Sequence, residues 1–261
     1  MTSQNSAEQK LNAAQSLIED RFPSYKSTLI ELSKIPGIAW EAFDPAELER
    51  SAEAVAKIFS ETGIFDFVEI RRAEANGKPG APAVVAKRAA KAGKPQILLY
   101  AHHDVQPPGD ETVWQTSPFD PVEKNGRLYG RGAADDKAGV VAHLAAIESL
   151  KAICGTDFDL GVTLFIEGEE EAGSPSFRNF LEENQADLRA DVIVVADSGN
   201  WTVDVPALTT TLRGLVSQVI EVSTLDHALH SGMYGGAVPD AMMATIKLLA
   251  TLHTDDGSVA I

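Results

Sequence analysis

The chain contains short apolar runs that are bounded by turn-forming residues. The clearest run covers residues 97–101, between Pro95 and a Pro-Pro-Gly turn at 107–109. An apolar run of this length with turn residues on both sides is typical of a strand buried on both faces of a parallel or mixed sheet. Similar runs at 161–166 and 192–196 predict two further strands of this kind.

Helical periodicity lies between these runs. Asp44 followed by Pro45 predicts a helix start, because an N-cap aspartate and a proline in the first turn are both favoured there. Val140, Leu144 and Ile147 recur at helical spacing and predict another helix. The full pattern predicts helices over 7–33 as two stretches, 45–62, 140–154 and 174–184, strands over 67–71 and 83–87, and a hairpin tip at 90–94. Alternating strands and helices predict an α/β fold with a mostly parallel or mixed sheet flanked by helices.

The pattern changes after Asp197. Residues 200–206 have the composition of a linker, and residues 207–225 alternate between apolar and polar positions with many threonines and valines. Such alternation predicts an antiparallel sheet. A helix with apolar residues on one face closes the chain. We therefore predict two domains, residues 1–206 and a smaller α+β unit of residues 207–261.

The charge balance narrows the classes of partner. Lys and Arg total 22 against 38 Asp and Glu, so the formal net charge is −16. A chain this acidic is repelled by phosphates, which argues against nucleic acid and anionic membranes as partners. Cys154 is the single cysteine, which excludes an internal disulfide and fits a reducing compartment. The polar amino-terminal residues and the lack of an apolar run of about 18 residues argue against a secretory signal and a membrane span, so we predict a cytoplasmic protein.

Four polar clusters follow predicted strands or precede predicted helices. They are AHHD at 101–104, GRGAADDK at 130–137, EGEEEAGS at 167–174 and VVADSG at 194–199. Because ligands of open α/β sheets bind at the carboxyl ends of the strands, we expect these side chains to lie together. Imidazole and carboxylate groups are typical ligands of zinc and manganese, and so many carboxylates are most simply accommodated by two dications.

The order and spelling of these motifs resemble a known family. His-His-Asp-Val-Gln-Pro at 102–107, Trp114, Ser-Pro-Phe at 117–119 and the run from Gly126 to the Asp-Asp-Lys at 135–137 resemble the co-catalytic dizinc hydrolases. This family includes carnosinase, cytosolic nonspecific dipeptidase, aminoacylase and acetylornithine deacetylase, and the Val-Gln-Pro and Asp-Asp-Lys spellings are most similar to its dipeptidase branch. The resemblance extends over nearly all of the chain from about residue 25. It implies a zinc-peptidase-like catalytic domain followed by an incomplete lid or dimerisation domain.

The resemblance also implies a role for each candidate residue. His102 and Asp197 would bind the first metal, Asp135 would bridge both metals, Glu171 would bind the second, Glu170 would be the general base, Asp104 would orient His102, and His230 would reach the partner subunit's active site. The strand period of two supports the pairing of His102 with Asp104, because residues two apart point to one side of a strand. The choice of Glu170 over Glu171 as the base rests on the resemblance alone. The family pattern also implies a cis peptide bond between Asp135 and Asp136.

The implied activity is hydrolysis of a peptide bond in dipeptides or short peptides by a water activated by two metal ions. Zinc is the expected metal, with manganese or cobalt as alternatives, and a homodimer is the expected assembly. The alternative activities are removal of the acyl group from an N-acyl amino acid and a non-catalytic metal-binding assembly module. Without the resemblance, simpler interpretations hold: His102 and Asp104 form a buried polar pair, Asp197 caps a turn, Glu169 lies in an exposed acidic turn and His143 is exposed.

One ligand of the family pattern is not found in the sequence. In the family, the second metal's last ligand is a histidine near the carboxyl end of the chain. This sequence ends at Ile261 inside the predicted small domain, and His253 lacks the context of that ligand. We therefore expect the chain to be the amino-terminal part of a longer polypeptide, or to be completed by another chain, and to lack full dimetal activity alone. We also expect an open sheet edge with exposed apolar surface.

Overall fold

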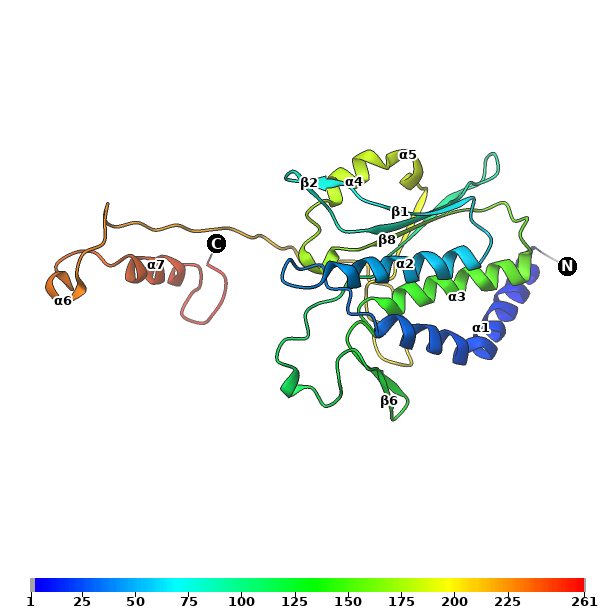
Figure 1. Ribbon diagram of the computed structural model, residues 1–261, viewed down its shortest axis with the longest axis horizontal. Coiled ribbons are helices and arrows are strands. Elements are labelled where there is room, and N and C mark those ends of the chain that lie inside the picture. Colours follow the sequence, from blue (N-terminus) through cyan, green and yellow to red (C-terminus); the bar gives the residue numbers. More distant parts are fainter. Residues whose placement is uncertain (1–2, 261) are drawn as a thin grey trace. The chain divides into compact units, whose positions relative to one another are not determined.

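The computed structural model describes residues 3–260 (Figure 1). The chain separates into two compact units, Met1–Ala207 and Leu208–Ile261. Their assignment as a catalytic domain and a lid or dimerisation domain stays a prediction. Among the described residues, no helix combines the length and the apolar character needed to cross a bilayer.

A mixed five-stranded sheet forms the centre of the first unit. Its order is β1-β4-β8-β5-β9, with β5, β8 and β9 parallel and the pairs β1–β4 and β4–β8 antiparallel. The strands are β1 (Phe67–Arg71), β4 (Ala83–Arg88), β5 (Gln96–His102), β8 (Gly161–Glu167) and β9 (Val192–Val195). Two small hairpins, β2 (Glu74–Ala75) with β3 (Lys78–Pro79) and β6 (Val122–Lys124) with β7 (Arg127–Tyr129), lie outside this sheet. The predicted α/β class with a mixed sheet is confirmed.

Helices cover both faces of the sheet. Figure 1 shows α1, α2 and α3 on one face and α4 and α5 on the other. Their bounds, with the two short 3-10 turns, are α1 (Ser3–Ser33), α2 (Pro45–Glu61), η1 (Glu111–Val113), α3 (Lys137–Cys154), η2 (Glu170–Ala172), α4 (Phe177–Glu183) and α5 (Gln185–Leu188). Asp44 caps α2 as predicted, because its carboxylate accepts the Ala46 N–H at 2.9 Å.

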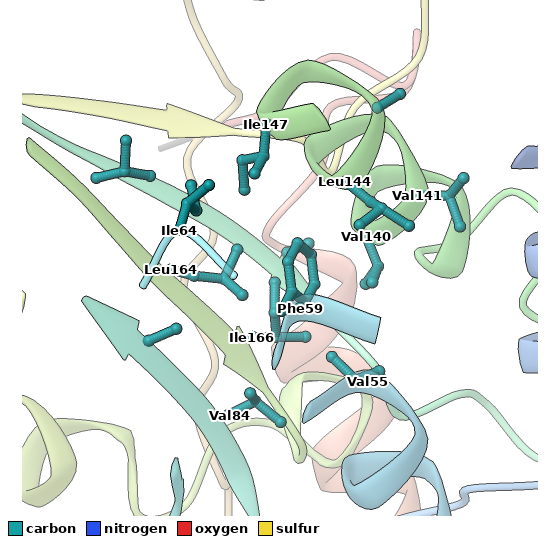
Figure 2. Close-up of a cluster of buried hydrophobic side chains, with 14 of the residues drawn as sticks. Val55, Phe59, Ile64, Val84, Val140, Val141, Leu144, Ile147, Leu164 and Ile166 are labelled. Carbon is teal, nitrogen blue, oxygen red and sulfur yellow. The ribbon is translucent and has the colours of Figure 1, made fainter. Parts of the chain in front are cut away.

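The alternation of side chains along the strands creates two cores. Val84 and Ala86 of β4 belong to the core under α1, α2 and α3, whereas Val85 faces the opposite core with Phe165 and Phe180. In the first core, Phe59 of α2 is fully buried beside the α3 and β8 side chains (Figure 2). Burial of one such side chain contributes roughly 1.5–3 kcal/mol. The apolar runs of the sequence are therefore strands with helices on both sides.

Two local predictions for the first unit are wrong. Residues 90–94 are not the tip of a hairpin, because β8 lies between β4 and β5 in the sheet. Residues 7–33 form one helix rather than two, and this helix continues through Pro23. Ile18 and Tyr25, on either side of that proline, both pack into the first core, so tertiary packing holds the two stretches in one helix.

The second unit contains little regular structure. Its helices are α6 (Ser231–Tyr234) and α7 (Ala241–Ala250). The antiparallel sheet predicted for residues 207–225 is wrong, since no strand is assigned to that stretch. Most of its residues are exposed, with Leu208 at 92% and Val219 at 98%. An alternating pattern forms a strand only when a neighbouring strand accepts its hydrogen bonds.

Candidate metal centre

The polar clusters meet at one edge of the sheet. Because β5, β8 and β9 are parallel, their carboxyl ends point the same way, and His102 and Glu167 are paired as the last residues of β5 and β8. Asp197 follows β9, and Asp135 lies just before α3. Four segments that are distant in the sequence thus deliver imidazole and carboxylate groups to one place.

Two groups of side chains at this edge are close enough to share a cation. His102, Asp135 and Glu171 offer ligand atoms within 4.8 Å of one another, and so do His102, Asp136 and Asp197. The structure therefore gathers the four predicted metal ligands and adds Asp136, which the sequence reasoning did not select. The division of these ligands between a first and a second metal stays a prediction.

His102 is buried and has an oxygen acceptor at each ring nitrogen. Its Nδ1 lies 3.0 Å from the Asp104 backbone oxygen and 3.3 Å from Asp104 Oδ1, while its Nε2 lies 3.0 Å from Asp135 Oδ1. A neutral imidazole carries only one N–H and cannot satisfy acceptors on both sides. A second proton or a cation is needed at Nε2, so this donor set fits a divalent metal.

The charges around His102 favour its protonated form. Burial alone would lower the pKa of the imidazole, but the hydrogen bond to Asp104 and the negative charges of Asp104, Asp136 and Asp197 raise this pKa to about 10. The centre therefore has a negative potential that holds a positive charge in place. A metal ion would satisfy the same carboxylates without a protonated ring.

Asp104 connects the histidine to the glutamate turn. Its buried carboxylate accepts the backbone N–H of Glu170 at Oδ1 (3.2 Å) and that of Glu171 at Oδ2 (3.0 Å). The nearer partner of the His102 ring is the Asp104 backbone oxygen rather than its carboxylate. Asp104 thus positions the η2 turn as well as the imidazole.

The three consecutive glutamates have three different environments. Glu169 is buried, with its carboxylate accepting the N–H of Ser176 (2.6 Å) and of Ala81 (3.1 Å), so the interpretation of Glu169 as an exposed acidic residue is wrong. Glu170 Oε2 lies 3.9 Å from His102 Nε2, and partial burial raises the pKa of its carboxyl. Glu171 joins the cation group instead.

Asp136 is a buried neighbour of the predicted bridging residue. The peptide bond between Asp135 and Asp136 is cis, as the resemblance implied. Asp136 Oδ2 accepts the backbone N–H of His102 at 3.1 Å, and burial raises the pKa of the Asp136 carboxyl to about 7. Its place as the second aspartate of the Asp-Asp-Lys motif is the signal that could have selected it.

His143 and His230 lie in different units of the chain. His143, expected to be exposed, is buried in α3, and its Nε2 lies 2.9 Å from the backbone oxygen of Tyr100. His230 belongs to the second unit, where its imidazole accepts the Gly232 N–H at 3.0 Å. Its catalytic role stays a prediction.

Comparison with known proteins identifies the family. Residues 98–254 match the model of peptidase family M20/M25/M40. The chain belongs to this family.

Curated relatives are dipeptidases and are longer than this chain. The chain is 41% identical to the cysteinylglycine-S-conjugate dipeptidase of Corynebacterium striatum over 64% of this chain and 36% of the relative. It is 33% identical to the Beta-Ala-His dipeptidase of Rattus norvegicus over 70% and 37%. It is 29% identical to the Cys-Gly metallodipeptidase dug1 of Schizosaccharomyces pombe over 94% and 52%. The matches therefore span about a third to a half of these relatives.

Solved structures share the fold. The M20 family metallo-carboxypeptidase Sso-CP2 from Sulfolobus solfataricus matches with a TM-score of 0.68 and 26% identity, over 90% of this chain and 51% of that chain. Human carnosine dipeptidase 1 matches with a TM-score of 0.67 and 24% identity, over 97% and 54%, which bears on the fold alone.

Proposed function

We propose that this chain carries the metal centre of a metallodipeptidase that hydrolyses the peptide bond of dipeptides. The observation that carries the proposal is the position of the buried His102 imidazole. It lies between two oxygen acceptors and belongs to both groups of side chains that are close enough to share a cation. Membership of the peptidase family and the dipeptidase names of the relatives support the reaction class.

We assign the metal ligands to His102, Asp135, Glu171 and Asp197, and zinc as the metal. Their nitrogen and carboxylate oxygen donors suit zinc, and 65% of the Asp135 side chain is exposed, so an ion can reach it from solvent. Two bound divalent ions would supply Lewis-acid chemistry, polarising the scissile carbonyl and acidifying water. Asp104 and Asp136 would hold the imidazole and the backbone around it in place.

Glu170 is assigned as the general base. Its side chain is 38% exposed and its carboxyl has a raised pKa because of burial, so it can accept a proton from water and return it to the departing amine. A carboxyl with a raised pKa is a better proton acceptor than an ordinary one near neutral pH. One residue thereby serves both proton transfers.

We further propose that the protein is a homodimer and that it lies in the cytoplasm. His230 would complete the active site of the partner subunit by stabilising the developing oxyanion. The single cysteine, Cys154, supports a reducing compartment.

The test is zinc binding by the purified chain, measured by competition with a chromophoric chelator. We expect zinc binding by the unaltered chain and its loss in His102→Ala, while the exposed His227→Ala serves as the matched control and keeps the affinity. Equal affinity in all three proteins would contradict the assignment. Hydrolysis of dipeptides and of N-acetyl amino acids, measured on the chain and on a form extended to the length of its relatives, separates the dipeptidase from a deacylase.

A further inference from the structure

We propose that Gln106, together with Trp40, is a positioning residue that fixes the carboxylate of Glu171 in the metal centre. The inference rests on the proposed function, because it concerns the orientation of a ligand assigned there. Gln106 lies four residues after the end of β5 and is partly buried. Its Nε2 lies 2.9 Å from the Glu171 backbone oxygen and 2.7 Å from Glu171 Oε2. A single amide group therefore donates to both the main chain and the side chain of the ligand.

Trp40 supplies a second donor to the same residue. Its Nε1 donates to the Glu171 backbone oxygen at 3.1 Å, so that this oxygen receives hydrogen bonds from two side chains. The Glu171 N–H in turn donates to Asp104 Oδ2 at 3.0 Å. Glu171 is thus held by the loop before α2, by the segment after β5 and by Asp104. The neighbouring Glu170 carboxylate lies 3.9 Å from His102 Nε2, which is beyond hydrogen-bond distance, so its position differs from that of the Glu171 carboxylate.

The chemistry of an amide suits this task. A carboxylate has two oxygens, and a donor on one of them fixes the orientation of the other. The amide of Gln106 is neutral, so it orients Glu171 without neutralising the charge that attracts a cation. A lysine or arginine in this place would compete with the metal for the same carboxylate. The hydrogen bond from Gln106 to Glu171 therefore gives a physical reason for the separate roles of Glu170 and Glu171. In the sequence, the choice between these two glutamates rests on the family resemblance alone.

Gln96 provides a matched control at the other end of β5. Its Nε2 donates to the Arg88 backbone oxygen (3.2 Å) and to Thr163 Oγ1 (3.0 Å), and its Oε1 accepts the Ala90 N–H (3.1 Å). These bonds connect strands and contact no residue of the metal centre. Removal of the Gln96 amide should lower the stability of the fold without changing the affinity for zinc.

The experiment compares Gln106→Leu, Trp40→Phe and Gln96→Leu with the unaltered chain. Zinc affinity is measured by competition with a chromophoric chelator, and unfolding is followed by circular dichroism with EDTA present. We expect Gln106→Leu to weaken zinc binding about 10-fold or more, the range found when partners of metal ligands are removed. Trp40→Phe should weaken binding less, and Gln96→Leu should lower only the unfolding midpoint. Trp40 is 49% exposed, so its variant keeps the test valid if Gln106→Leu fails to fold.

The outcomes separate this inference from the proposed function. Unchanged zinc affinity in Gln106→Leu and in Trp40→Phe, beside tight binding by the unaltered chain, would overturn the positioning role alone. An equal loss of affinity in Gln96→Leu would overturn it too, because the effect would then follow stability rather than contact with Glu171. Failure of the unaltered chain to bind zinc would overturn the proposed function and the inference together.

Discussion

At the scale of single residues, the environment of each carboxylate decides what it can do. Glu169, Glu170 and Glu171 are adjacent in the sequence but have different partners. Glu169 accepts a backbone N–H, Glu170 lies 3.9 Å from His102, and Glu171 accepts a hydrogen bond from Gln106. All three are glutamates, so the residue type alone predicts the same chemistry for each of them. Their hydrogen-bond partners separate them.

This separation predicts different results for two conservative substitutions. Glu171→Gln should weaken zinc binding strongly, because it replaces a charged ligand with a neutral amide. Glu170→Gln should keep the affinity within a few-fold while abolishing any hydrolysis, because the base is lost but the ligands stay. Chelator competition and a peptide hydrolysis assay check both. Loss of zinc in Glu170→Gln with retention in Glu171→Gln would mean that the two assignments are reversed.

A buried imidazole makes the stability depend on pH. Burial lowers the pKa of His143. As the pH falls below the ordinary pKa of histidine, the unfolded chain therefore binds a proton that the folded chain does not bind. The stability contributed by the neutral ring is complete above the unfolded pKa of about 6.5 and is lost as the pH falls through the folded pKa, with a slope of at most about 1.4 kcal/mol per pH unit.

His143→Gln isolates this contribution, because glutamine can still donate to the backbone oxygen of Tyr100. Urea unfolding of both proteins with EDTA, between pH 7.5 and 5, should show the unaltered chain losing stability relative to His143→Gln as the pH falls. A difference that stays constant over this range would contradict the account. His102, whose pKa is raised, contributes the opposite change in stability with pH. Because both proteins contain His102, this contribution cancels in the comparison.

Much of the candidate site could be predicted at the residue scale, and the omissions have a common cause. His102, Asp135, Glu171 and Asp197 follow strands or precede a helix, and the topology brings them together. Gln106 and Trp40 were missed because an amide and an indole have no signature as metal-centre residues. Their role depends on the three-dimensional position of Glu171, which lies far from both in the sequence.

At the scale of elements, local signals placed most helices and strands where the structure has them. The apolar runs correctly predicted β5, β8 and β9. The Asn125-Gly126 turn, which has positive φ at both residues, joins β6 to β7. The hairpin expected at 90–94 failed because β8 inserts between β4 and β5. That pairing is a long-range property which local pattern does not carry.

The cap of α2 gives a test at this scale. Asp44→Ala removes the acceptor of the Ala46 N–H at the helix start, and we expect a loss of about 1 kcal/mol in the free energy of unfolding. Asp44→Ser, which keeps a capping oxygen, should lose much less. Denaturant unfolding followed by circular dichroism measures both. Equal stability of Asp44→Ala and the unaltered chain would show that the cap is unimportant.

At the scale of the whole molecule, the edge strand β9 is exposed. Its residues Val192 to Val195 have exposed fractions of 49%, 63%, 43% and 55%, and within residues 3–260 the only strand that pairs with β9 is β5. An exposed apolar edge strand promotes pairing with other chains. The sequence expectation of an open edge is thus met within residues 3–260.

We therefore expect concentration-dependent self-association of the 261-residue chain, seen by light scattering. Ile193→Lys, which adds a charge to the exposed strand, should reduce it without changing zinc affinity. A matched Val113→Lys substitution, at an exposed residue outside the sheet, should have little effect. Identical scattering by all three proteins would contradict a role for the edge.

The parallel strands of the mixed sheet bring imidazole and carboxylate groups from four segments together, and we propose that these groups bind a divalent cation. Crystals grown with zinc and measured at the zinc absorption edge test this most directly. The account predicts an anomalous peak about 2.0–2.2 Å from His102 Nε2 and from carboxylate oxygens of Asp135 and Glu171 or Asp197. A zinc peak elsewhere on the chain, or none at this edge, would contradict it.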